Sequence, residues 1–149
     1  MILTGGYQVK VQSGFSLIEL VVTIAIVGIL AGIAYPSYVN SITATKRKTA
    51  EACLSSFGTH MERFYTTNLR YDQNGAGAAV TLPALDCASA QNSGRDYRFS
   101  LQAVARSTYT LRAVPLAPQT TRDAKCGTLT LDQAGTRGAS GSDGPNKCW

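Results

Sequence analysis

An apolar stretch from Phe15 to Val39 constrains this chain more than any other feature of its sequence. Within these residues the only formal charge is that of Glu19. A helix needs about 20 predominantly apolar residues to cross a bilayer, whereas apolar runs of about 10–14 residues are typical of buried core helices. The stretch therefore predicts a membrane-spanning helix near the start of the chain rather than a core helix.

Glu19 lies inside this apolar stretch, where a carboxylate is costly. Insertion scales put the cost of a comparable charge at about 2.5–3.5 kcal/mol in the middle of a membrane helix, and at less near the ends. An ionisable residue in such a place indicates a function and needs a partner of opposite charge. The partner available beside Glu19 is a new N-terminal ammonium group, which exists only if the chain is cut just before Phe15.

The heptapeptide Gly-Phe-Ser-Leu-Ile-Glu-Leu, residues 14–20, resembles the prepilin-peptidase site of type IV pilins. The resemblance implies that the peptide bond after Gly14 is cleaved. It also implies that Phe15 becomes the N-methylated first residue of the mature protein, and that Glu19 is the assembly glutamate of the family.

The same resemblance divides the chain into a cleaved prepilin leader (residues 1–14), a transmembrane and filament-core helix (15–39) and a globular pilin head (40–149). Pro36 is expected to kink the helix, because proline removes a backbone hydrogen bond. The implied location is the inner membrane of a Gram-negative bacterium, crossed once, and later the pilus on the cell surface. The implied partners are other pilins in a helical filament, the prepilin peptidase and the inner-membrane assembly machinery. No small-molecule substrate and no cofactor are expected.

Four cysteines lie beyond the apolar stretch, and they are Cys53, Cys87, Cys126 and Cys148. An even number of cysteines in a small exported domain indicates two disulfide bonds, and four cysteines allow three pairings. The pilin resemblance favours Cys126 with Cys148, which leaves Cys53 with Cys87. No metal site is expected, because the chain has no Cys-x-x-Cys pair and His60 is its only histidine.

Beyond the apolar stretch the helix is expected to continue to a total length of about 50 residues. Apolar residues between positions 50 and 65 recur with the period of one helix face, which predicts that this half packs on a sheet. They are Ala50, Cys53, Leu54, Phe57, Met61, Phe64 and Tyr65.

Three later segments, 97–103, 109–113 and 128–132, alternate between apolar and polar residues as half-buried strands do. Arg106-Ser107 is expected to turn the first two into an antiparallel hairpin. The predicted fold is therefore α+β, a type IV pilin fold with the long helix packed on a small antiparallel β-sheet of three or four strands. Its C-terminal region is expected to be closed by a disulfide.

Residues 66–96 are predicted to form a loop region, with a short element at Val80–Leu85 against the helix. The tail, residues 133–149, is rich in glycine. We expect it to hold a shape only when a disulfide between Cys126 and Cys148 closes it.

The C-terminal half resembles that of PilE/ComP-like minor pilins, through residues 108–113, residues 122–141 and the final Cys-Trp pair. This resemblance implies a minor pilin, a structural subunit that acts in pilus assembly and through it in motility, adhesion or DNA uptake. One alternative is a competence-type pilin that acts as a DNA receptor. A second alternative is a pseudopilin of type II secretion.

The formal net charge is +5, which is mildly basic. The candidate contacts to DNA or to other subunits are Lys46, Arg47, Lys48, Arg122, Lys125 and Arg137, with Arg95, Arg98, Arg106, Arg112 and Lys147 as further basic residues for DNA. The run at 46–48 is interpreted first as a solvated anchor at the membrane interface. No stripe of aromatic residues for base stacking accompanies these basic residues. No enzyme is predicted, because the sequence has neither a nucleotide-binding motif nor a recognisable acid–base constellation.

Overall fold

The computed structural model describes residues 14–149. The predicted leader therefore lies outside the described residues, except for Gly14. The chain separates into two compact units, with the boundary between Tyr38 and Val39. The helix α1, Leu17–Asn68, is continuous through this boundary.

Within the first unit, the described chain is one apolar helix whose side chains are all exposed. Phe15 is 82% exposed and Ile33 is 71% exposed. By length and composition, α1 is able to cross a membrane. The helix runs on through Pro36, and the kink expected at this residue stays a prediction. Because such a large contiguous apolar surface is unfavourable in water, this unit needs a covering of lipid or of other helices.

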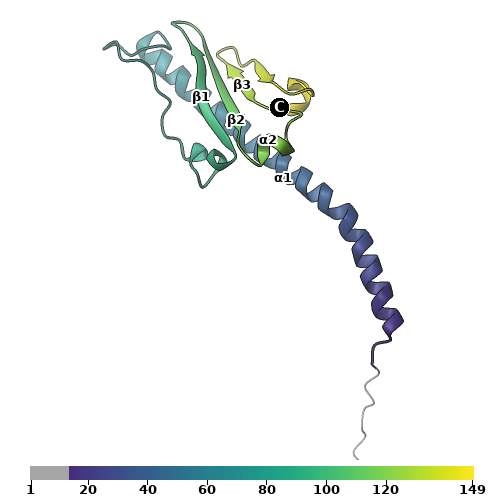
Figure 1. Cartoon of the computed structure of the whole chain (residues 1–149). Coiled ribbons are helices and arrows are strands. Elements are labelled where there is room, and N and C mark those ends of the chain that lie inside the picture. The colour runs from purple at the N-terminus through teal and green to yellow at the C-terminus, as the bar shows by residue number, and fades with distance from the viewer. Residues whose placement is uncertain (1–13) are drawn as a thin grey trace, which may run out of the picture. The chain divides into compact units, whose positions relative to one another are not determined.

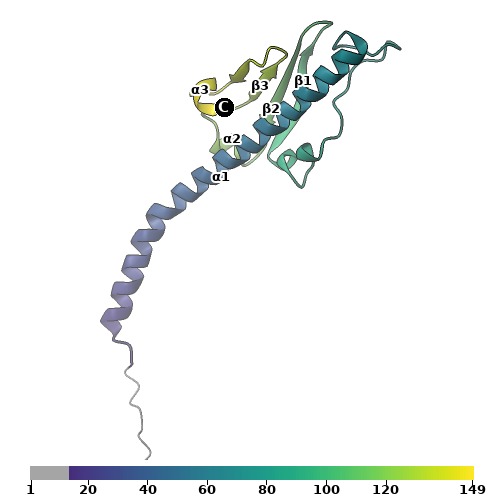
Figure 2. The ribbon, with the colours of Figure 1, turned by 180° about the vertical axis from the view of Figure 1, so that it is seen from behind.

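The second unit is a four-stranded antiparallel sheet that packs on the second half of α1 (Figure 1). Its strands are β1 Tyr97–Val104, β2 Tyr109–Pro115, β3 Leu129–Asp132 and β4 Arg137–Ala139, and they pair in that order. In the view from behind, α1 lies in front of the sheet, so the helix covers one sheet face and leaves the other open (Figure 2). The predicted α+β fold is confirmed.

The core lies between α1 and the covered face of the sheet. The helix contributes the buried residues Ala50, Cys53, Leu54, Phe57 and Met61, and the strands contribute Tyr97, Tyr109, Leu111, Ala113 and Leu129. The predicted helix face is thus confirmed, with Phe64 and Tyr65 half-buried at its end. Because side chains alternate along a strand, Leu111 points into the core while Arg112 is exposed on the open face.

The connection from α1 to β1 differs from the expectation in one detail. The prediction of a short element at Val80–Leu85 is wrong, because these residues adopt neither helix nor strand. Val80, Leu82 and Leu85 nevertheless pack against the core, so their apolar side chains reflect burial without regular backbone structure. Two single 3₁₀ turns follow, at Asp86–Ala88 and Ser93–Arg95.

Two disulfides hold the irregular parts of the head. Cys53 in α1 is joined to Cys87 in the connection, and Cys126 is joined to Cys148 near the end of the chain. Within the segment that the Cys126–Cys148 disulfide closes, the glycine-rich tail forms β4 and the short helix α3, Pro145–Cys148. A further short helix, α2 (Gln119–Arg122), lies between β2 and β3.

Candidate functional site

The residues predicted for processing and assembly lie at the start of α1. Gly14 and Phe15 precede the helix, and Glu19 lies in its first turn, where the helix dipole favours a negative charge. Glu19 is exposed, and among residues 14–149 no cationic side chain lies within ion-pair distance of it. The carboxylate is therefore available to a group outside the described chain.

The basic run at 46–48 is not the free cationic patch that the sequence suggested. Lys46 Nζ lies 2.6 Å from a carboxylate oxygen of Asp96, and Lys48 Nζ lies 3.0 Å from one of Glu51. Arg47 forms an ion pair with Asp123 and its side chain is only 13% exposed. The interpretation of Arg47 as a solvated anchor is therefore wrong, because packing of α1 on the α2 region largely buries its side chain. Of the three side chains only that of Lys48 is exposed.

Asp123 is the centre of a buried polar network that the sequence did not reveal. Besides the Arg47 ion pair, it accepts a hydrogen bond of 2.9 Å from the hydroxyl of Tyr97. Gln119, in α2, donates to the Thr43 carbonyl at 3.0 Å and to the Tyr97 hydroxyl at 3.2 Å. Burial raises the pKa of Tyr97 well above its ordinary value, so its hydroxyl keeps its proton and remains a donor. The network joins α1 to α2 and β1.

A second cluster links the far part of α1 to the hairpin. Tyr71 donates to Glu62 at 3.0 Å, and the hydroxyl of Tyr109 donates to the same carboxylate at 3.1 Å. Burial, followed by the hydrogen bond to Glu62 and its charge, raises the pKa of Tyr71 to about 12. We interpret the cluster as a structural contact between α1 and the hairpin.

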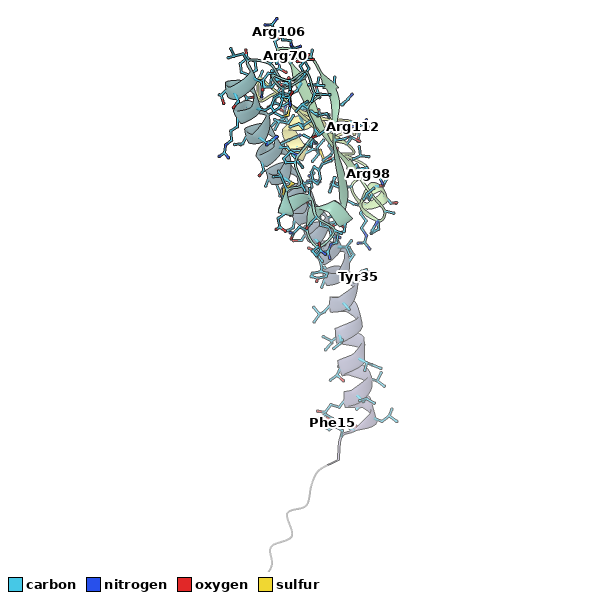
Figure 3. All side chains as sticks on the ribbon, turned by 90° about the vertical axis from the view of Figure 1, so that its left-hand side faces the viewer. Phe15, Tyr35, Arg70, Arg98, Arg106 and Arg112 are labelled. Carbon is cyan, nitrogen blue, oxygen red and sulfur yellow. A yellow bond between two sulfur atoms is a disulfide. The ribbon has the colours of Figure 1, made fainter. Side chains whose placement is uncertain are left out.

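The open face of the sheet carries arginines of the β1–β2 hairpin. Arg98 and Arg112 are exposed on adjacent strands, and Arg112 Nε donates to Ser100 Oγ at 2.9 Å. Arg106 is exposed in the turn of the hairpin, at the end of the head where Arg70 also lies (Figure 3). Arg70 is engaged by Asp72 through two hydrogen bonds of 2.6 and 2.8 Å. Arg98, Arg106 and Arg112 have no ion-pair partner among the described residues.

The remaining basic residues belong to the C-terminal region of the head. Arg122, Lys125 and Lys147 are exposed around α2 and the second disulfide. Arg137 is exposed too, but its guanidinium carbon lies 5.3 Å from the centre of the Trp149 ring, as in a cation–π contact. Arg95 lies 3.4 Å from Asp96, with its side chain 65% exposed.

Comparison with known proteins identifies the class first and the family second. Residues 9–35 match the prokaryotic N-terminal methylation motif, which with this fold defines a type IV pilin. Residues 36–130 match the family described as type IV minor pilin ComP, DNA uptake sequence receptor, and the chain belongs to this family. A pilin with this motif and an apolar N-terminal helix is anchored in the membrane before it reaches the pilus surface. This family consists of pilins, which are structural subunits of a filament.

Curated relatives match part of the chain. It is 39% identical over 77 residues to the type IV major pilin protein PilE1 of Neisseria gonorrhoeae, covering 50% of this chain and 46% of the relative. It is 38% identical over 86 residues to the type IV major pilin protein PilA of Myxococcus xanthus strain DK1622, covering 50% of this chain and 39% of the relative. The match thus spans less than half the length of these relatives. Among solved structures, the non-core minor pilin PilV of Neisseria meningitidis aligns with a TM-score of 0.48 and 24% identity, over 68% of this chain and 90% of that one.

Proposed function

We propose that this chain acts as a minor subunit in the assembly of a type IV pilus. Before assembly it crosses the inner membrane of a Gram-negative bacterium once, with residues 15–39 in the bilayer and residues 40–149 outside. Its partners are other pilins, the prepilin peptidase and the assembly machinery. The observation that carries this proposal is an apolar helix with every side chain exposed and a single carboxylate, Glu19, in its first turn. We assign no catalytic reaction to the chain.

In this proposal cleavage after Gly14 creates a cationic partner for Glu19, which has none among the described residues. The new ammonium group of Phe15 in one subunit attracts Glu19 of its neighbour in a low-dielectric environment, where a charge pair interacts far more strongly than in water. A charge-assisted hydrogen bond between them sets the axial position of the incoming subunit. The apolar surfaces of the helices are then covered by one another in the filament core.

Mass spectrometry of surface fibres sheared from cells tests this function. We expect a mature chain that begins at N-methylated Phe15, in trace amount beside a different, dominant pilin. If this chain were itself the dominant species, it would be a major pilin. If it were absent from the fibres, the chain would instead be a pseudopilin or a subunit confined to the base of the pilus. The match to the ComP family favours a subunit of the pilus itself.

A second candidate function is DNA reception, which the matched family's description and the arginines of the hairpin support. Arg98, Arg106 and Arg112 lie on one hairpin and form no ion pair within residues 14–149, and arginine is well suited to contact phosphate oxygens. Phosphate contacts supply affinity that depends on salt but carry no sequence information. We therefore propose this hairpin as the part of the head that holds the DNA backbone.

Replacing all three arginines by glutamine (Arg98→Gln, Arg106→Gln and Arg112→Gln) is expected to weaken binding of duplex DNA on the order of 100-fold at about 0.1 M salt. Each lost phosphate contact should also reduce the slope of log affinity against log salt by about 0.9. The measurement is fluorescence anisotropy of a labelled duplex with the full chain in neutral detergent, between about 50 and 200 mM salt.

A matched variant controls for net charge in this experiment. Arg122→Gln, Lys125→Gln and Lys147→Gln remove the same charge from another part of the head, and this variant should retain most of the DNA affinity. Equal losses of DNA affinity in the two variants would mean that binding depends only on the overall charge of the head. A receptor should also prefer one DNA sequence over scrambled competitor, and equal weak binding to every duplex would argue against this function.

A further inference from the structure

A basic pocket lies in the head between the beginning of its helix, α2 and the C-terminal loop. Its volume is about 490 Å³, and its cationic lining residues are Arg47, Arg122, Lys125 and Lys147. Arg47, the segment from Arg122 to Lys125, and Lys147 are well separated in the sequence, so the pocket exists only in the folded head. Arg137, which the sequence grouped with Arg122 and Lys125, is not among its lining residues.

The second disulfide builds this pocket. Lys125 and Lys147 are the immediate neighbours of Cys126 and Cys148, so the bond between the two cysteines brings the two lysines to one place. Two backbone hydrogen bonds strengthen the junction, since the N–H of Gly141 donates to the carbonyl of Cys126 at 2.9 Å and that of Asp143 donates to Lys125 at 3.0 Å. A side chain at Gly141 would collide with the backbone of Lys125, so the close approach requires glycine.

The charges of the pocket do not cancel. Arg47 is neutralised by Asp123 within the buried network described above. Among the described residues, Arg122, Lys125 and Lys147 have no ion-pair partner, although Asp143 is also a lining residue. Three exposed cations around one concave site are a suitable environment for a phosphate group, which guanidinium and ammonium groups bind through charge-assisted hydrogen bonds.

The sequence position of the pocket indicates where this phosphate comes from. Its lining includes Asn40, the first residue after the apolar stretch, and Thr43, one turn further along α1. At about 1.5 Å per residue, Thr43 lies only about 6 Å along the helix beyond Val39. When the apolar stretch spans the bilayer, the pocket is therefore within reach of the lipid headgroups.

We propose that this pocket binds the headgroup phosphate of an anionic phospholipid while the chain is still anchored in the membrane. The proposal rests on the membrane-anchored state in the function proposed above. A lipid held there fixes the head at the membrane surface until the subunit is extracted into the filament. Binding also requires the Cys126–Cys148 disulfide, because that bond holds two of the three cations together.

Native mass spectrometry of the full chain, released from neutral detergent after titration with phosphatidylglycerol or phosphatidylcholine, tests this site. We expect one retained phosphatidylglycerol and much less phosphatidylcholine. Since each cation close to an anionic lipid contributes about fivefold to binding, the variant with Arg122→Gln, Lys125→Gln and Lys147→Gln should lose about 100-fold in affinity for phosphatidylglycerol. The Arg98→Gln, Arg106→Gln and Arg112→Gln variant, with the same charge change, should bind this lipid as the unaltered chain does.

Several outcomes would overturn the proposal. Equal retention of the two lipids would show that the anionic headgroup is not recognised, and equal losses in the two variants would show a response to net charge alone. If a short DNA duplex displaced the lipid from the unaltered chain, the pocket would belong to a DNA surface. Near-ultraviolet circular dichroism and intact disulfide masses verify that each variant is folded. A failure here would leave the pilus function untouched, because incorporation into fibres is measured separately.

Discussion

Replacing Glu19 by alanine is expected to leave the protein folded and inserted in the membrane, while its amount in sheared fibres falls at least about 100-fold. Removing one partner of a buried ion pair costs about 3–5 kcal/mol, because the other charge stays buried without compensation. Here the uncompensated group is the N-terminal ammonium of the neighbouring subunit. The measurement is the ratio of this chain in fibres to this chain in membranes, by quantitative mass spectrometry.

Two further variants sharpen this test. Glu19→Gln keeps the size and hydrogen-bonding capacity of the side chain but removes its charge. We expect this variant to be excluded from fibres as the alanine variant is. Thr23→Ala, in the same exposed helix segment, removes a hydroxyl that donates to the Leu20 carbonyl of its own helix at 2.8 Å. It should enter fibres normally. Normal incorporation of either Glu19 variant would refute the ion-pair mechanism.

The second large effect is expected at Asp123, in the network inside the head. Asp123→Ala removes the nearer carboxylate partner of Arg47 and the acceptor of the Tyr97 hydroxyl. The second carboxylate partner of Arg47, that of Glu51, stays 3.9 Å from its Nε. Removing one partner of a buried ion pair costs about 3–5 kcal/mol, and Glu51 offsets part of this cost, so the midpoint of thermal unfolding should fall by about 10 °C. Near-ultraviolet circular dichroism of the full chain in detergent reports the loss of packing around the tyrosines.

Asp143→Ala is the matched control for this effect. Asp143 is a half-buried aspartate that lines the pocket described above, and no ion pair to it is found within residues 14–149. Its replacement should change the midpoint by only a few degrees. A double variant, Arg47→Leu with Asp123→Leu, removes both charges and should recover much of the lost stability, because apolar side chains often replace a buried ion pair at little cost. Equal shifts for Asp123→Ala and Asp143→Ala would show that the network is not a stabilising unit.

Local sequence patterns were enough to predict the class, the fold and the core face of the helix. The methylation motif is a contiguous string, and the apolar stretch is continuous. The buried face from Ala50 to Met61 follows from the helical period alone. The strands at Tyr97 and Tyr109 follow in the same way from alternation, because the side chains of a strand point to opposite faces. In each case the physical constraint acts between residues that are near neighbours along the chain.

Contacts between distant residues set the charge distribution of the head, and local patterns do not encode them. The run at 46–48 looks like a free basic patch in the sequence. Yet Lys46 pairs with Asp96 across 50 positions and Arg47 with Asp123 across 76. Lys125 and Lys147 lie apart in the sequence and form no ion pair within the described residues, yet a disulfide brings them into one pocket, where their charges add. Whether a cation is neutralised or remains available depends on which chain segments pack beside it, so only the folded head distinguishes its buried ion pairs from its binding surfaces.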